Sequence, residues 1–302
     1  MSKIIFEAAF IEDAVFRFAA EKETRGNKEG LDSFYSQRNV IYEIPSAVER
    51  DQSFQQFYEK KFLEFGLRRL FDGIFLEFPF LDQPKLSIYV KRVYSKKDES
   101  AELFRDGDAL NVLVTIQPVR VNDQEYLKAF LRHELMHISD MLDPAFQYNP
   151  AVQLNALNDT EENLVRERFR ILWAIFIDAR TFRKGLTPLW PIEKYERDFG
   201  KAFQFWAKDE RNQVLDRLTS GESFTHSDLL HWSMDYRLTK NLGEGGLLCP
   251  VCLLPAYTTA DKDVFCSPDV VERIKTDRPD WKEAMGICSQ CFDLYSSRIK
   301  VA

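Results

Sequence analysis

The chain has 302 residues, of which 45% are hydrophobic and 29% are charged. This composition is typical of a folded globular protein and excludes a disordered chain, and the length allows one large domain or two of ordinary size. The net charge of −7 argues against a broad basic surface, so we do not expect nucleic acid as a partner.

The N-terminal segment lacks the unbroken apolar stretch of a signal peptide, because Glu7, Glu12 and Asp13 interrupt it. No apolar run approaches the roughly 20 residues that span a bilayer. One of the longest, Ile171–Ile177, is short. We therefore expect a cytoplasmic protein with no membrane partner.

The N-terminal part of the chain reads mainly as helix, with an amphipathic stretch at Ile4–Glu21 and a long aromatic and leucine-rich stretch at Ser53–Phe75. Two strands are predicted next, at Leu86–Tyr94 and Leu110–Gln117, because both are rich in Val, Ile and Leu or Tyr. The charged segment Ser95–Asp108 separates them and carries no strand prediction.

A helix is predicted from about Asp123 to Leu142. Asn122 is a plausible N-cap, with Glu125 three residues later, and the pair Asp143-Pro144 supplies a stop. Its amphipathic pattern predicts one apolar arc that faces the core.

A second long helix is predicted from about Glu161 to Lys184, where Gly185 ends it. Two or three more helices fit Ile192–Asp235. The glycine-rich segment at 243–246 follows, and the composition changes after it, so we place the domain boundary there.

The predicted helix over 123–142 carries the pentapeptide His133-Glu134-Leu135-Met136-His137. Two histidines four apart share one face of a helix and can reach one metal ion. Glu134 lies in the middle of the apolar arc, where a carboxylate without a partner would cost several kcal/mol. Zinc-bound water would supply that partner, with Glu134 as its general base.

This stretch resembles the zincin metallopeptidases, whose HExxH helix follows a strand that pairs with extended substrate. The resemblance covers about residues 85–185. It implies that Leu110–Gln117 is the substrate-pairing edge strand and that the substrate is a peptide or protein.

A catalytic zinc site usually has three protein ligands, and the motif supplies two. Asp178 is our choice for the third, because it interrupts an apolar helical face and must find a cation there. An arginine is the alternative partner for Asp178, although neither Arg180 nor Arg183 shares its face well. A third ligand on the following helix resembles the gluzincin arrangement, in which Glu stands where this chain has Asp.

Two other aspartates compete with Asp178. Asp143 lies ten residues after His133, as the third ligand does in the HExxHxxGxxH pattern, but Asp140 stands where that pattern needs Gly. Asp140 is a better candidate for a hydrogen bond to a zinc-bound imidazole. Arg180 and Arg183 could stabilise an oxyanion, although solvated arginines are the simpler interpretation.

All five cysteines lie in the last 54 residues, and four of them form the CxxC pairs Cys249/Cys252 and Cys288/Cys291. Four thiolates suit one closed, tetrahedral, structural zinc site. The module resembles a zinc ribbon or treble-clef knuckle and is near neutral, which favours a protein partner over nucleic acid. The fifth cysteine, Cys266, is a buried apolar residue or an additional thiol near the site.

The fold prediction is therefore α+β: a mainly helical zincin-like domain with a small β-sheet over 1–242, followed by a four-cysteine module over 247–302. Within the first domain, 1–80 forms a helical part and 85–185 the catalytic core. The cofactors are two zinc ions, one catalytic and one structural.

The function predicted is a zinc-dependent hydrolase, expected to be a peptidase, with Glu134 as general base. The alternative is a zinc-stabilised interaction protein with a non-catalytic HExxH site. A nucleic-acid-associated protease similar to SprT-like proteins is a third reading, which the acidic balance and the roughly 110-residue gap between the two sites weaken. His226 and His231 are interpreted as surface or capping residues.

Overall fold

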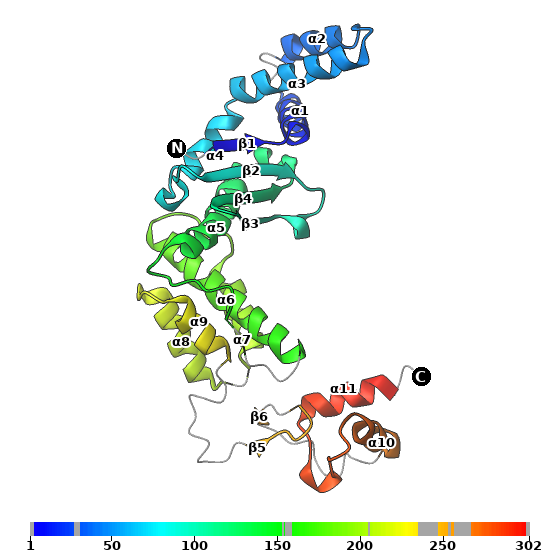
Figure 1. The fold of residues 1–302 in the computed structure, drawn as a ribbon. Helices are drawn as coiled ribbons and strands as arrows, with labels where there is room; N and C mark the ends of the chain where they lie inside the picture. The colour runs from blue at the N-terminus through cyan, green and yellow to red at the C-terminus, as the bar shows by residue number, and fades with distance from the viewer. Residues whose placement is uncertain are drawn as a thin grey trace. The chain divides into compact units, whose positions relative to one another are not determined.

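We describe the fold from a computed structural model of residues 1–302 (Figure 1). The structure describes residues 3–26, 31–152, 154, 159–204, 206–234, 247–252, 255–256 and 267–299. These residues are mainly helical with a small mixed sheet, so the prediction of an α+β fold is confirmed.

The chain divides into two compact units. The first comprises Met1–Val152, Ile171–Glu196 and Arg217–Ser227, and it contains the four-stranded sheet and the HExxH helix. The second comprises Gln153–Arg170, Arg197–Asp216 and Asp228–Ala302, and it contains the four cysteines. The domain boundary predicted at 243–246 lies outside the described residues.

Four helices and one strand make up the N-terminal part. They are β1 (Lys3–Phe6), α1 (Ala8–Thr24), α2 (Leu31–Ile41), α3 (Ala47–Glu64) and α4 (Leu67–Phe75). The prediction of a helix from Ile4 was wrong, because Lys3–Phe6 pairs in parallel with the next strand of the sheet. The stretch Ser53–Phe75 is mainly helical, as expected, and it is divided between α3 and α4, because Gly66 adopts a positive φ of 72°.

The sheet contains β1, β2 (Leu86–Arg92), β3 (Ser100–Asp106) and β4 (Ala109–Ile116) in the order β1-β2-β4-β3. The first three strands in this order are parallel, and β3 is antiparallel to β4. Two expectations were wrong here. The charged segment 95–108 contains the strand β3, and β4 lies inside the sheet, whose two edge strands are β1 and β3.

The position of β4 follows from its side chains. Val112, Val114 and Ile116 are fully buried, as are Ile88 and Val90 of the paired strand β2. In both strands these residues alternate with half-buried or exposed ones, so one face of each strand is fully buried in the core. By contrast, the side chains of β3 are half-buried or exposed, as expected for an edge.

Three 3₁₀ turns lie at Pro79–Leu81 (η1), Lys96–Asp98 (η2) and Pro118–Asn122 (η3). Five further helices lie between the sheet and the cysteine module in the described sequence. The helices are α5 (Gln124–Leu142), α6 (Asp159–Arg183), α7 (Ile192–Ala202), α8 (Lys208–Ser220) and α9 (His226–Met234). The two long helices and the group of two or three that follow them were all predicted.

The cysteine module contains a short antiparallel pair, β5 (Leu247–Leu248) and β6 (Pro255–Ala256). Helices α10 (Pro268–Asp277) and α11 (Ser289–Ile299) follow, with a 3₁₀ turn (η5) at Glu283–Met285 between them. Across the part of the chain that the structure describes, no helix has the length and apolar character needed to cross a bilayer.

Candidate metal centres

Helix α5 carries the HExxH motif and is anchored at both ends. Its N-cap is Asp123, whose carboxylate accepts a hydrogen bond from Tyr126 N at 3.1 Å, so the prediction of Asn122 as the cap was wrong by one residue. The helix ends at Leu142, as predicted. Its predicted apolar arc is confirmed by the buried side chains Leu127, Phe130, Leu131, Leu135 and Ile138.

His133 is buried on this helix and is held by Asp178 of α6. The Nδ1 atom of His133 lies 2.7 Å from Oδ1 of Asp178. A carboxylate at Nδ1 fixes the ring orientation and places the proton on Nδ1, which leaves the lone pair of Nε2 free for a metal ion. Asp178 is therefore placed to orient a ligand.

The second oxygen of Asp178 is also engaged. Oδ2 accepts a hydrogen bond from the Tyr195 hydroxyl at 2.6 Å and another from Trp190 N at 3.1 Å. Three donors thus surround a carboxylate that is 3% exposed, which explains how it is buried without an arginine. Tyr195 and Trp190 could not be identified from the sequence, because they lie in a separate segment after α6.

His137 lies one turn further along α5, with its ring centroid 5.0 Å from that of His133. The edge of its ring meets Trp173 of α6, with the centroids 4.4 Å apart and the planes at 84°. Burial, together with His133 and Arg180, lowers the pKa of His137 well below its ordinary value. The ring is therefore neutral, which is the form that binds metal.

Asp140 forms a buried ion pair. Its carboxylate accepts hydrogen bonds from Arg180 Nη1 at 2.8 Å and Arg180 Nη2 at 2.5 Å, and from Trp173 Nε1 at 2.7 Å. Asp140 was expected beside a histidine, and Arg180 was interpreted as solvated. Instead, the two residues neutralise each other and fix the indole that packs on His137.

Asp143, the remaining candidate ligand, accepts a hydrogen bond from Ala145 N at 2.8 Å at the turn that ends α5. Arg183, the other arginine considered, donates to the Thr219 carbonyl at 2.9 Å. Within the described ranges, the one group of three or more His, Cys, Asp or Glu side chains that could hold a metal ion is the four-cysteine cluster. No third ligand converges on His133 and His137 among these residues.

Glu134 has a partner that the sequence did not reveal. Its Oε2 accepts a hydrogen bond at 3.0 Å from the backbone N–H of Ala101, in the edge strand β3. Burial raises the pKa of Glu134, while His133 and the Ala101 N–H oppose the shift. The motif glutamate therefore lies between the histidine pair and the free edge of the sheet.

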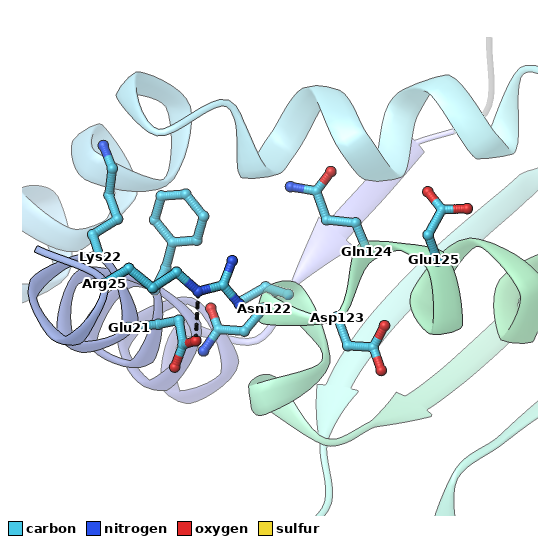
Figure 2. A pocket seen from close by; sticks show the side chains of 9 residues that line it. Glu21, Lys22, Arg25, Asn122, Asp123, Gln124 and Glu125 are labelled. Atoms are coloured by element: carbon cyan, nitrogen blue, oxygen red, sulfur yellow. Dashed lines mark hydrogen bonds and ion pairs between the residues drawn. The ribbon is translucent and has the colours of Figure 1, made fainter. Parts of the chain in front are cut away.

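Among the described residues, two cavities lie in the first unit, and neither is lined by His133, Glu134 or His137. One, of about 290 Å³, is lined by residues that include Arg132, Met136 and Thr181. The other, of about 540 Å³, lies between the end of α1 and the start of α5 (Figure 2). Acidic and basic side chains both line this cavity, and two of them, Arg25 and Glu21, form an ion pair at 2.8 Å.

The four predicted cysteines converge on one point in the second unit. The Sγ atoms of Cys249 and Cys291 are 3.9 Å apart, those of Cys252 and Cys288 are 3.8 Å apart, and all four lie within 4.8 Å of one another. Four sulfurs at roughly 2.3 Å from a tetrahedral zinc ion would be about 3.8 Å apart. The donor set therefore fits such an ion, and the spacing excludes disulfides, whose sulfurs are about 2.05 Å apart.

Local structure holds this cluster in place. The first CxxC pair lies next to the β5–β6 pair, and the second spans the start of α11. Cys288 N donates to Cys249 Sγ at 3.3 Å, and Cys291 N donates to Cys288 Sγ at 3.4 Å. Hydrogen bonds from the other three thiols lower the pKa of Cys249, so the cluster favours a thiolate.

Around the cluster the module has its own core, made by Val251, Val270, Ile274, Trp281, Ile287 and Tyr295. Cys266 lies outside the described residues. Of the two histidines interpreted as surface or capping residues, His231 is exposed, whereas His226 is buried at the first residue of α9, so a surface position is wrong for His226.

Comparison with known proteins adds no family assignment. The chain matches no protein-family model, no curated protein and no solved structure.

Proposed function

We propose that this chain is a zinc-dependent hydrolase of the HExxH type that acts on peptide bonds. The observation that carries the proposal is the hydrogen bond between His133 Nδ1 and Asp178, which leaves His133 Nε2 free beside His137. A histidine whose second nitrogen is held by a buried carboxylate is the usual arrangement of a metal ligand.

His133 and His137 would hold the ion. Zinc bound there would supply a water of lowered pKa and would polarise the scissile carbonyl. Glu134 would accept a proton from that water at Oε1, because its Oε2 is already held by the Ala101 N–H. The same residue could then pass the proton to the leaving amine.

The edge strand β3 supports an extended peptide as substrate. The Ala101 N–H donates to Glu134 and therefore points away from β4. Backbone groups alternate in direction along a strand, so those of Leu103 and Arg105 share the outward direction of Ala101. A peptide that paired with Leu103 and Arg105 would pass beside Glu134.

A second candidate function is supported by a different observation. The three aspartates considered as third ligands are all engaged elsewhere, by His133, by Arg180 and by the turn after α5. This favours a zinc-stabilised interaction protein in which the four-cysteine module serves a protein partner and the HExxH site does not turn over substrate.

Zinc titration combined with a peptide-cleavage assay separates the two functions. For the hydrolase, wild type should bind a second zinc beyond the one in the cysteine cluster, and His133→Ala should remove it. Cleavage of a quenched-fluorescence peptide library at saturating zinc should be lost in Glu134→Gln, which keeps the metal. A second zinc without cleavage supports the interaction protein. If wild type binds no second zinc at any zinc concentration, the HExxH site holds no metal and the hydrolase proposal is wrong.

A further inference from the structure

Cations and aromatic rings alternate in one row of side chains in the first unit. The guanidinium of Arg120 lies 4.2 Å from the centre of the Tyr126 ring, and the ammonium of Lys96 lies 5.2 Å from the same centre. Lys96 also lies 5.0 Å from the centre of the Trp190 ring, which Lys194 approaches at 4.4 Å. These five residues, the cation–aromatic row, bring three positive charges together in a chain whose net charge is −7.

Lys96 is the cation of this row that is open to an outside partner. Arg120 is neutralised by Glu99, a buried carboxylate that also accepts the Tyr126 hydroxyl. Lys96 is exposed, and no carboxylate of the described residues pairs with it. Its two flanking rings attract the ammonium without neutralising it. Lys96 therefore presents a positive charge in a held position to solvent.

Trp190 connects the cation–aromatic row to the histidine pair. Its backbone N–H donates a hydrogen bond to Asp178 at 3.1 Å, and the same carboxylate lies 2.7 Å from His133 Nδ1. The ring that holds Lys96 thus belongs to the residue that supports the orienting carboxylate. This places the row on the side of the HExxH site that is formed by the segment after α6.

The edge strand β3 leads to the same place. Lys96 lies in η2, just before β3, and Ala101 near the start of β3 donates to Glu134. A peptide that followed the edge of β3 past Glu134 would therefore continue toward Lys96. Tyr126 precedes Glu134 by eight residues on α5, which is about 12 Å along the helix axis. An extended peptide covers that distance in about three to four residues.

We propose that Lys96 is a specificity residue of this site, and that the peptide substrate carries a carboxylate about three to four residues from the bond that is cleaved. The inference deepens the proposed function and rests on it. The carboxylate comes from an acidic side chain or from the C-terminus of the peptide, and Lys96 would pair with either. Because Tyr126 and Trp190 already hold the ammonium, less side-chain freedom is lost when the pair forms.

The test measures peptide binding by isothermal titration calorimetry to the zinc-saturated full chain carrying Glu134→Gln, so that the peptides stay intact. The probes are a neutral peptide with blocked ends, a series with one Asp moved along it, and the same peptide with a free C-terminal carboxylate. We expect one carboxylate position to bind about 5-fold more tightly than the neutral peptide, the upper end for an exposed ion pair. The Asp series and the free C-terminus separate the two sources of the carboxylate.

Substitutions then assign the gain to one residue. Lys96→Met should abolish the preference for the carboxylate, and Lys96→Arg should retain it, since Arg keeps the charge and also packs on aromatic rings. Lys97→Met is the matched control, because Lys97 is the next residue of the same turn and is also exposed. It removes an equal charge from η2 and should leave the preference unchanged.

The outcomes are distinct. Equal binding of the neutral peptide and every carboxylate peptide overturns this inference, and cleavage by wild type then still supports the proposed function. Equal losses in Lys96→Met and Lys97→Met overturn the assignment to Lys96, because they show a diffuse positive surface. A preference that depends on Lys96, found together with no cleavage by wild type, overturns the proposed function and supports carboxylate recognition by an interaction protein.

Discussion

The Nδ1 atom of His133 lies 2.7 Å from Oδ1 of Asp178, although 45 residues separate them in the sequence. The contact joins the HExxH helix to the following helix, and it is supported by the Tyr195 hydroxyl and the Trp190 N–H on the other carboxylate oxygen. Asp178 thus fixes the orientation of the His133 ring.

Replacing Asp178 by Asn should weaken zinc binding at the histidine site by about 10–100-fold, because the amide no longer fixes the tautomer of His133 or raises its basicity. Zinc titration of the cluster-loaded protein measures the change. Asp143→Asn is the matched control, since Asp143 caps a turn. Equal affinities of the two variants would contradict the orienting role of Asp178.

Replacing Arg180 by Met should destabilise the first unit by about 3 kcal/mol, because it leaves the Asp140 carboxylate buried without its counter-ion. Urea denaturation followed by tryptophan fluorescence measures the loss. Lys85→Met breaks an exposed pair with Asp108 and should change the free energy of unfolding by less than about 1 kcal/mol. Similar losses in the two variants would show that the Asp140 pair is not effectively buried.

Replacing Cys288 by Ser should remove one zinc equivalent and unfold the module, because three thiolates leave the tetrahedral site open and the small core cannot compensate. Zinc stoichiometry and the helical dichroism signal measure both effects. Cys266→Ser is the control and should retain the metal. Retention of zinc by the Cys288 variant would contradict the four-thiolate site.

The stability of the first unit should decline as the pH falls below 6.5. Burial lowers the pKa of His226 below its ordinary value of 6.5, so the unfolded chain takes up a proton there before the folded chain does. His137, whose pKa is also lowered, contributes with the same sign. The contribution of neutral His226 to the free energy of unfolding is fully present above pH 6.5. It is lost as the pH falls toward and through the lower pKa that His226 has in the folded chain.

Replacing His226 by Phe should therefore make the free energy of unfolding less dependent on pH below 6.5. Urea midpoints measured across that range test it. Tyr148→Phe keeps an aromatic ring 5.0 Å from the His226 ring and should preserve the wild-type slope. An unchanged slope in His226→Phe would show that its burial does not control the titration.

Local patterns were enough to predict several features. The spacing of Cys249, Cys252, Cys288 and Cys291 predicted one cluster. Each CxxC pair is close in sequence, and two such pairs supply the four thiolates that bind one tetrahedral zinc ion. The α5 apolar stripe was also readable, because helical periodicity is a property of neighbouring residues. The α+β class followed from the same periodicities.

The edge of the sheet was not readable from the sequence. Strand β3 has a charged, half-exposed pattern that resembles a loop, and β4 was expected at the edge because it precedes the HExxH helix. Strand order depends on which backbones pair, and pairing is a long-range choice that side-chain pattern constrains only through burial. The partner of Glu134, the Ala101 N–H, was hidden for the same reason.

The sequence by itself thus determined which residues are candidates for metal chemistry: two histidines and a glutamate on one predicted helix, and four thiols in two CxxC pairs. Only the tertiary structure decided what each carboxylate does. Asp178 holds a histidine, Asp140 neutralises Arg180, and Glu134 meets a strand edge. A buried carboxylate must find a donor, but the donor comes from whichever element packs against it, and that is fixed by the packing of helices and strands distant in sequence.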